Sequence, residues 1–234
     1  MEYLVIDVGG TAIKYACMNE NAEFLERGEI PTPMDSLDSY LAALGTIIHR
    51  YDHNVEGIAM CVPGIIDSVQ GVCITGGNLR YVKGLPLATL LEERYGLRVS
   101  LENDARCAAL AELWRGSLKN CADGVVIVLG SAVGGALVKN GSIHKGSHFS
   151  AGEISFIEKD GDISDICNSV GYQNGVLSLY RLVEQQTGIP AAELDGIRIF
   201  EMANRGDAGV LEAIDRFAKS LARVIHNIDR KSVV

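Results

Sequence analysis

The first residues able to carry chemistry lie between two apolar stretches at the start of the chain. Asp7, Gly9, Gly10 and Thr11 follow one apolar run, and the strand-like segment after them carries Lys14. The pattern predicts a β-hairpin whose turn is bare backbone, because glycine accepts positive φ and leaves N–H groups uncovered for phosphate. Asp7 could hold Mg²⁺ or its water shell. An ordinary hairpin stays the alternative, since short glycine motifs are common.

The same arrangement recurs in the second half of the chain. A buried-strand run ends at Leu129, and the predicted turn after it holds Gly130, Ser131, Gly134 and Gly135. Two such hairpins on facing domains can grip a nucleotide triphosphate from both sides, which predicts a cleft enzyme that closes. Two ordinary hairpins in one sheet would explain the apolar runs, but not a hydroxyl with paired glycines in both turns.

The residues between the two turns suit a sugar substrate. Asn103 and Asp104 stand where a strand ends and a helix begins. The helix dipole favours an ionised carboxylate there, and Asp104 could accept a hydroxyl proton as that oxygen attacks phosphorus. Asp104 as a plain N-cap is the alternative. The amide of Asn103 can bind paired sugar hydroxyls, and Gly64, Asn78 and Glu153 are further candidate contacts in loops.

The elements that position these residues follow an α/β order. Strands are expected near 2–8, 12–18, 24–30, 57–62 and 98–101, and helices near 37–48 (capped by Ser36), 85–95, 104–114, 173–188, 196–205 and 207–228. This order predicts mixed sheets. The second half restarts the order at residue 124, so we expect a joint at 118–123 and domains spanning 1–118 and 119–234.

Composition and charge exclude several other classes of protein. The net charge of -9 and the pI near 5.0 argue against a nucleic-acid partner, because phosphate backbones require clustered Lys and Arg. No apolar run is long enough to span a bilayer, and the chain starts without a basic leader. We therefore expect a cytoplasmic protein with no membrane partner. The six cysteines lack C-x-x-C spacing, which indicates structural thiols.

In their chain order, these motifs resemble the ROK family of sugar kinases and sugar-responsive regulators. The matching stretches are 7–14, 62–64, 77–79, 102–105, 129–135 and 152–154. The resemblance implies a two-domain, actin-like (ribonuclease H-like) ATPase fold and ATP-dependent phosphorylation of a hexose or hexoside hydroxyl. It implies that Asp104 is the base, that Asn103 and Glu153 bind sugar, and that the two glycine turns clamp the phosphates.

One departure from the family pattern concerns metal. Many members follow the Gly-Glu segment with Gly-His and a cysteine-rich zinc motif, but here Ser155 and Phe156 stand in place of Gly-His, and only Cys167 follows. One thiol cannot complete the tetrahedral site of a structural zinc. We therefore expect Mg²⁺ with ATP and no zinc. With an aromatic residue in place of the histidine, the chain resembles the zinc-less branch of the family that includes β-glucoside kinases, and this resemblance favours a β-glucoside substrate.

The second departure is at the C-terminal end. Family kinases continue beyond the helix that matches 221–228 with a strand, a glycine-rich adenine-binding turn and closing helices. We therefore expect an incomplete second domain, weak ATP binding and self-association as a homodimer, because uncovered strand edges pair with other chains. A sugar-binding remnant without turnover, or a sugar-responsive regulator lacking its DNA-binding domain, stays open as an alternative.

Overall fold

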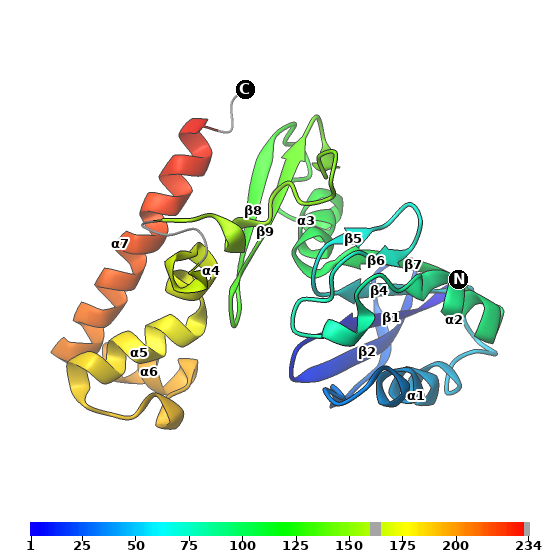
Figure 1. Ribbon diagram of the computed structural model, residues 1–234, viewed down its shortest axis with the longest axis horizontal. Coiled ribbons are helices and arrows are strands. Elements are labelled where there is room, and N and C mark those ends of the chain that lie inside the picture. Colours follow the sequence, from blue (N-terminus) through cyan, green and yellow to red (C-terminus); the bar gives the residue numbers. More distant parts are fainter. Residues whose placement is uncertain (160–164, 232–234) are drawn as a thin grey trace. The chain divides into compact units, whose positions relative to one another are not determined.

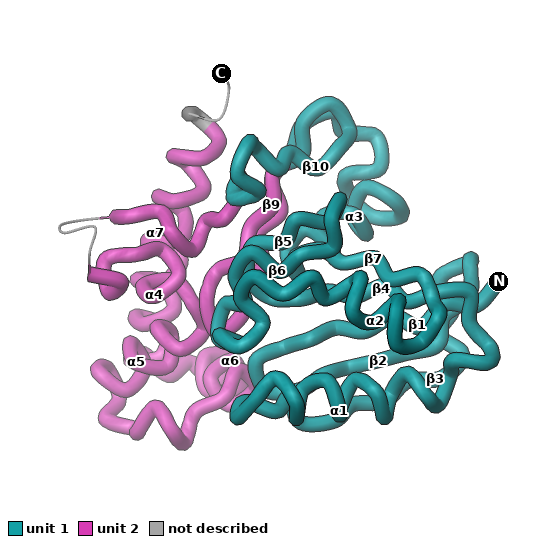
Figure 2. Tube along the Cα trace, turned by 45° about the vertical axis from the view of Figure 1, so that its right-hand side comes forward, with its two compact units in different colours: residues 1–124, 138–151 teal, residues 125–137, 152–234 magenta. Residues whose placement is uncertain are grey.

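The computed structural model describes residues 1–159 and 165–231 (Figure 1). Its contacts divide the chain into two compact units (Figure 2). The first consists of residues 1–124 and 138–151, and the second of residues 125–137 and 152–234. The division into domains at residue 118 stays a prediction of the sequence.

The first unit is built on a mixed five-stranded sheet with the order β3-β2-β1-β4-β7. Three antiparallel strands form the meander that the sequence predicts, and two further strands continue the sheet in parallel with β1. Their bounds are β1 Glu2–Val8, β2 Ala12–Asn19, β3 Phe24–Pro31, β4 Gly57–Val62 and β7 Arg98–Asn103. A small hairpin of β5 (Ile66–Asp67) and β6 (Val72–Cys73) follows β4.

The carboxyl ends of the three parallel strands are level with one another. Asp7 on β1 pairs with Cys61 on β4, and Cys61 pairs with Glu102 on β7. Ligands of open parallel sheets bind beyond this edge, where the loops that follow the strands converge. The register therefore brings Asp7 and the segment around Asn103 to the edge where a binding site is expected.

Capping residues mark where helices of the first unit begin and end. Helix α1 (Leu37–Ile48) is capped by Ser36, whose hydroxyl accepts the N–H of Ser39, as predicted. Helix α2 (Leu87–Tyr95) ends at Gly96, which is left-handed at φ 69°. A short turn, η1 (Arg80–Val82), precedes α2, and α3 (Asp104–Arg115) follows β7 directly.

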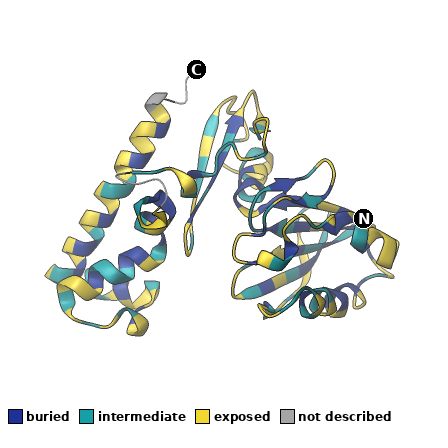
Figure 3. Ribbon diagram, viewed as in Figure 1, coloured by how far each residue is buried: buried dark blue, intermediate teal, exposed yellow. Residues whose placement is uncertain are grey.

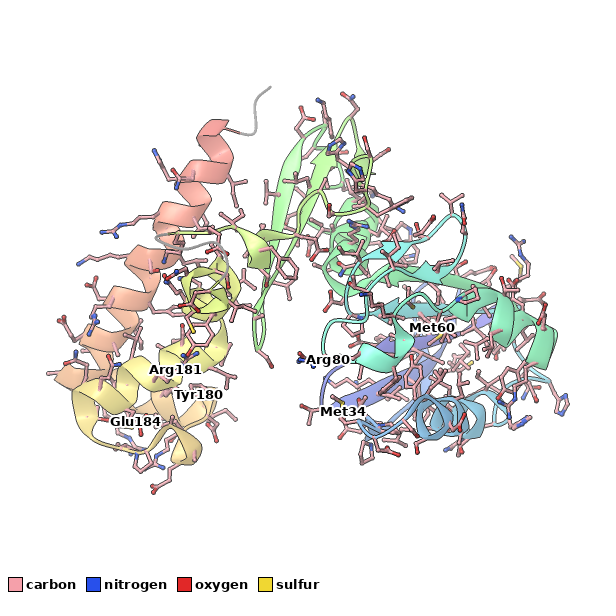
Figure 4. The ribbon with its side chains drawn as sticks, in the orientation of Figure 1. Met34, Met60, Arg80, Tyr180, Arg181 and Glu184 are labelled. Carbon is pink, nitrogen blue, oxygen red and sulfur yellow. The ribbon has the colours of Figure 1, made fainter. Side chains whose placement is uncertain are left out.

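The core of the first unit lies between the sheet and helices α1 and α2. Along β4, buried Ile58, Met60 and Val62 alternate with more exposed neighbours, so one face of the strand is covered. Met60, which Figure 4 labels, belongs to the same cluster as Leu44 of α1 and Leu91 of α2. Figure 3 shows these buried residues in dark blue. The core thus fixes the strands whose ends carry the candidate site.

The second unit combines strand segments with helices. β8 (Gly124–Leu129), β9 (Val133–Lys139) and β10 (Ser142–His144) form a sheet in the order β10-β9-β8, of which β10 and the end of β9 belong to the first unit. Three helices, α5 (Val176–Thr187), α6 (Gly196–Asn204) and α7 (Ala208–Lys231), share a core of Val183, Ile199 and Val210. The second unit also contains three short 3-10 helices: η2 (Ile154–Phe156), η3 (Ile166–Asn168) and η4 (Ala191–Glu193).

One predicted helix is interrupted in the structure. The sequence predicts a single helix near 173–188, but α4 (Val170–Asn174) and α5 are separate because Gly175 is extended, with φ -71° and ψ 162°. A Cβ on Gly175 would lie 2.3 Å from the carbonyl oxygen of Ser131, so the break seats the helix junction against the second glycine turn. Over residues 1–159 and 165–231, no helix is long and apolar enough to cross a membrane.

Candidate active site

The turn between β1 and β2 is only partly the bare backbone that the sequence predicts. The N–H of Gly9 donates to the carbonyl of Ala12 at 3.0 Å, and the Gly9 carbonyl accepts the hydroxyl of Thr32 at 2.7 Å. Both backbone groups of Gly9 therefore hold the turn itself. Gly10 and Thr11 are exposed, so the part of the turn that can approach a ligand lies after Gly9. Thr32 had no recognisable motif.

Asp7 and Lys14 face each other across the two strands that flank this turn. Partial loss of water raises the pKa of Asp7 above its usual value, Lys14 opposes that rise, and the carboxylate of Asp104 adds to it. The repulsion means that Asp7 and Asp104 are near neighbours. Two carboxylates beside a lysine at the end of a parallel sheet form the charged centre of the candidate site.

Asp7 and Lys14 also line a mainly apolar cavity of about 630 Å³, together with Cys61 and Cys107. The cavity lies over the sheet, and the glycines of the β1–β2 turn do not line it.

Asn103, and not Asp104, caps helix α3. The side-chain oxygen of Asn103 accepts the N–H of Arg106 at 3.1 Å, and its amide donates to the carbonyl of Gly64 at 3.0 Å. The alternative that Asp104 is a plain N-cap is therefore wrong: Asp104 is the first helical residue, and its side chain is exposed. Asn103 is buried, and these bonds leave one amide N–H for a ligand.

Gly64 and Asn78 lie against this cluster. A Cβ on Gly64 would be 2.6 Å from the carbonyl oxygen of Thr75 and 2.8 Å from the nitrogen of Gly77. The amide nitrogen of Asn78, which is exposed, lies 3.9 Å from the position of a Cβ on Gly10. The first unit thus brings together the predicted site residues Asp7, Gly10, Gly64, Asn78, Asn103 and Asp104.

Replacement of Gly64 tests whether this cluster depends on close backbone approach. Gly64 has φ +97°, so Gly64→Ala adds backbone strain and a collision with backbone atoms that cannot swing away. We expect it to lower the free energy of unfolding by at least about 2 kcal/mol. Gly84→Ala is the control, because Gly84 has φ +74° with nothing within 4 Å of a Cβ; it should cost about 1–2 kcal/mol. Urea unfolding measures both, and equal losses would contradict the collision.

The raised pKa of Asp7 predicts a stability gain on its neutralisation. Between the ordinary value of 3.8 and the higher folded value, the folded protein binds more protons than the unfolded chain, so stability falls as pH rises through this window. Asp7→Asn carries no charge and escapes this loss. We expect the variant to be more stable than the parent at pH 7 in Mg²⁺-free buffer, with the difference vanishing near pH 3. Lower stability of the variant at pH 7 would show that the attraction between Asp7 and Lys14 outweighs both the partial loss of water and the repulsion by Asp104.

Three charged residues that were not predicted as site residues form a group of ion pairs beside Asn103: Glu102, Arg106 and Lys145. Glu102 is buried at the end of β7, its Oε2 lies 2.6 Å from Nζ of Lys145, and its Oε1 lies 3.5 Å from Nη1 of Arg106. The side chain of Arg106 is fully buried. A carboxylate at the end of a strand, followed four positions later by an opposite charge, is the sequence signal that could have identified this pair.

The second glycine turn is shorter than the sequence predicts. The N–H of Gly130 donates to the carbonyl of Ala132, and β9 already begins at Val133. The prediction that the turn runs through Gly134 and Gly135 is therefore wrong. Gly135 is buried in β9, and a Cβ there would lie 2.5 Å from the carbonyl oxygen of Gly152, so close packing explains this glycine. Ser131 and Gly130 remain in the turn.

Glu153 lies in the second unit, directly before η2, and is partly exposed. Phe156, which stands where many family members carry histidine, is 68% exposed. Among the residues that the structure describes, no three His, Cys, Asp or Glu side chains are grouped so that they could hold a metal ion. The absence of zinc stays a prediction.

The chain is similar in sequence and in structure to known proteins of one family. The model of the ROK family matches residues 3–231. The N-acetyl-D-glucosamine kinase of Vibrio cholerae is 31% identical, over 97% of this chain and 79% of that kinase, and the β-glucoside kinase of Klebsiella pneumoniae is 29% identical, over 97% of this chain and 77% of that kinase. A ROK family protein from Streptococcus pneumoniae, solved with sucrose, superposes with a TM-score of 0.83 at 30% identity, over 99% of this chain and 77% of its own.

Proposed function

The chain belongs to the ROK family, and on that premise we propose that it is a sugar kinase that transfers the γ-phosphoryl group of ATP to a hydroxyl of a hexose or hexoside. The observation that carries the proposal is the exposed carboxylate of Asp104 at the first position of α3, close enough to Asp7 to raise its pKa. The positive end of the helix dipole favours a negatively charged side chain at this position.

Asp104 is the general base in this proposal. A sugar hydroxyl within hydrogen-bond distance of its carboxylate gives up its proton as the hydroxyl oxygen attacks the γ-phosphorus, and ADP leaves. Asn103 offers its remaining amide N–H to a neighbouring sugar hydroxyl, and Gly64 holds Asn103 in place through its carbonyl. Asn78 and Glu153 are further proposed sugar ligands.

The phosphate-binding groups are proposed from the two turns. Gly10 and Thr11 are exposed beside Lys14 on the next strand, so an N–H, a hydroxyl and an ammonium can meet one phosphate. Gly9 contributes by shaping this turn. From the second turn, Gly130 and Ser131 are proposed phosphate contacts. Gly134 and Gly135 lie in β9 and not in the turn, so a role for them in phosphate binding stays a prediction of the sequence.

The charges around Asp7 fit a magnesium ion. Asp7 and Asp104 repel each other, and hard divalent cations prefer carboxylate and water oxygens. Asp7 would hold the ion through its carboxylate or through water. When bound, the ion would neutralise charge on the phosphate oxygens. Zinc has no place in the proposal, and a homodimer stays a prediction.

A coupled assay of ADP release tests the proposed function. The purified chain is assayed with ATP and Mg²⁺ against N-acetylglucosamine, glucose, fructose and a panel of β-glucosides. We expect ADP release that depends on one or a few of these sugars. Calorimetric sugar binding with no ADP release from any of them would instead favour the sugar-binding remnant without turnover, and neither binding nor turnover would contradict both functions.

Metal dependence is a separate prediction. Dialysis against EDTA should abolish ADP release, and Mg²⁺ should restore it, because phosphoryl transfer requires a cation that neutralises the phosphate oxygens. Elemental analysis of protein purified without added metal should find no stoichiometric zinc. About one zinc per chain would contradict the argument from Phe156 and Cys167.

A further inference from the structure

The loop that precedes Glu153 is fastened to the start of α3 by a single buried arginine. Nη2 of Arg106 donates to the carbonyl of Phe149 at 2.6 Å and lies 3.5 Å from the carbonyl of Ala151. The loop closes on itself where the N–H of Ala151 donates to the carbonyl of Lys145. One guanidinium therefore connects the helix that carries Asp104 to two backbone carbonyls at the end of this loop.

Glu102 holds the arginine and the other end of the loop at once. Its Oε1 accepts the N–H of Asn103 at 2.9 Å and faces Arg106, while its Oε2 pairs with Lys145 at 2.6 Å. Lys145 also donates to the hydroxyl of Ser68. A buried carboxylate is stable only when it is paired and hydrogen-bonded, and here its partners are the backbone of the N-cap residue of α3, Arg106 and Lys145.

The backbone of the loop needs such a restraint. Phe149 has φ +56°, a left-handed conformation that costs an aromatic residue about 1–2 kcal/mol. Its own carbonyl is the group that receives the short bond from Arg106. The guanidinium thus stabilises a strained conformation two residues before Ala151, and Glu153 follows Ala151 after one further residue.

We propose that Arg106 is a positioning residue of the sugar site, which fixes the conformation of residues 145–151, the segment of the first unit that leads into Glu153. The proposal rests on the proposed function, in which Glu153 binds sugar. Arg106 touches no reacting atom: it is fully buried, and it acts through the carbonyls of Phe149 and Ala151. Its loss should weaken sugar binding more than it slows the chemical step or weakens ATP binding.

The test compares Arg106→Met, Arg106→Lys and the control Arg115→Met in steady-state kinetics. Methionine fills similar space without donating a hydrogen bond. Lysine keeps the positive charge but lacks the planar fork, of which one nitrogen faces Glu102 while the other reaches the loop carbonyls. Arg115 is an exposed residue of the same helix whose guanidinium lies over the ring of Trp114. We expect Arg106→Met to raise the sugar KM roughly tenfold or more with an unchanged ATP KM, Arg106→Lys to be intermediate, and Arg115→Met to match the parent.

Hydrogen exchange without any ligand separates failure of this inference from failure of the proposed function. The amides of residues 145–151, that of Ala151 above all, should exchange faster in the Arg106 variants than in the parent and the Arg115 control. If the parent phosphorylates no sugar, the proposed function fails, and exchange still decides whether Arg106 holds the loop. Unchanged exchange, or equal changes in kcat and in both KM values, would overturn the inference. If Arg106→Met does not fold, Arg106→Lys carries the same comparison.

Discussion

Asp104→Asn is expected to lower kcat by roughly 10²–10⁴-fold and to leave the sugar KM nearly unchanged. Asparagine has nearly the same shape but cannot take the hydroxyl proton. Because Asn103 already caps α3, and Asp104 is exposed, the substitution removes no cap and leaves no buried group unpaired. Coupled ADP release measures kcat and KM directly.

Asp38→Asn is the matched control for that substitution. Asp38 is also an exposed carboxylate in the first turn of a helix, α1, so its loss weakens the interaction with the helix dipole to a similar extent. We expect it to leave kcat unchanged and stability slightly reduced. A kcat of Asp104→Asn close to that of the Asp38 variant would contradict the role of Asp104 as base.

Asn103→Ala is expected to have the largest effect on stability. The substitution removes the cap of α3, worth about 0.5–2 kcal/mol. It also leaves the Gly64 carbonyl without the amide that donates to it, and a buried polar group without its partner costs about 1–3 kcal/mol. The sum predicts a loss of about 1.5–5 kcal/mol in the free energy of unfolding, measured by urea denaturation.

Ser36→Ala isolates the capping contribution. Ser36 caps α1 through the N–H of Ser39, as Asn103 caps α3 through the N–H of Arg106, but Ser36 does not bridge to another loop. Its loss should be about 0.5–2 kcal/mol. The difference between the two variants measures the bond from Asn103 to Gly64. Equal losses would mean that this bond adds no stability.

The architecture of the first unit was predictable because its elements carry strong local signals. The apolar runs of β1 and β4, the Ser36 cap and the helix end before Gly96 each predict a boundary that the structure reproduces. The order of the motifs identified the ROK family, and the family match over residues 3–231 confirms it. The actin-like fold is confirmed by the superposition on the pneumococcal family member.

What the sequence could not predict depends on contacts between distant segments. Gly175 interrupts a good helical pattern because it packs on the carbonyl of Ser131, 44 positions earlier in the chain. Gly135 resembles part of a phosphate-binding turn in the sequence, but a glycine is needed there because a Cβ would collide with the backbone of Gly152. The double use of Asn103, as a cap and as a donor to Gly64, and the position of Arg106 beneath residues 149–151 also appear only once the loops are in place.

Transfer of a labelled γ-phosphoryl group is the most direct test of the account. The chain is incubated with γ-labelled ATP, Mg²⁺ and the sugar that gives the fastest ADP release, and the label is followed into sugar phosphate, inorganic phosphate and protein. The account predicts label in the sugar phosphate, formed by the parent chain and by the Asp38→Asn control, and almost none with Asp104→Asn. Label that appears only as inorganic phosphate, or an Asp104→Asn variant that labels the sugar as fast as the parent, would contradict it.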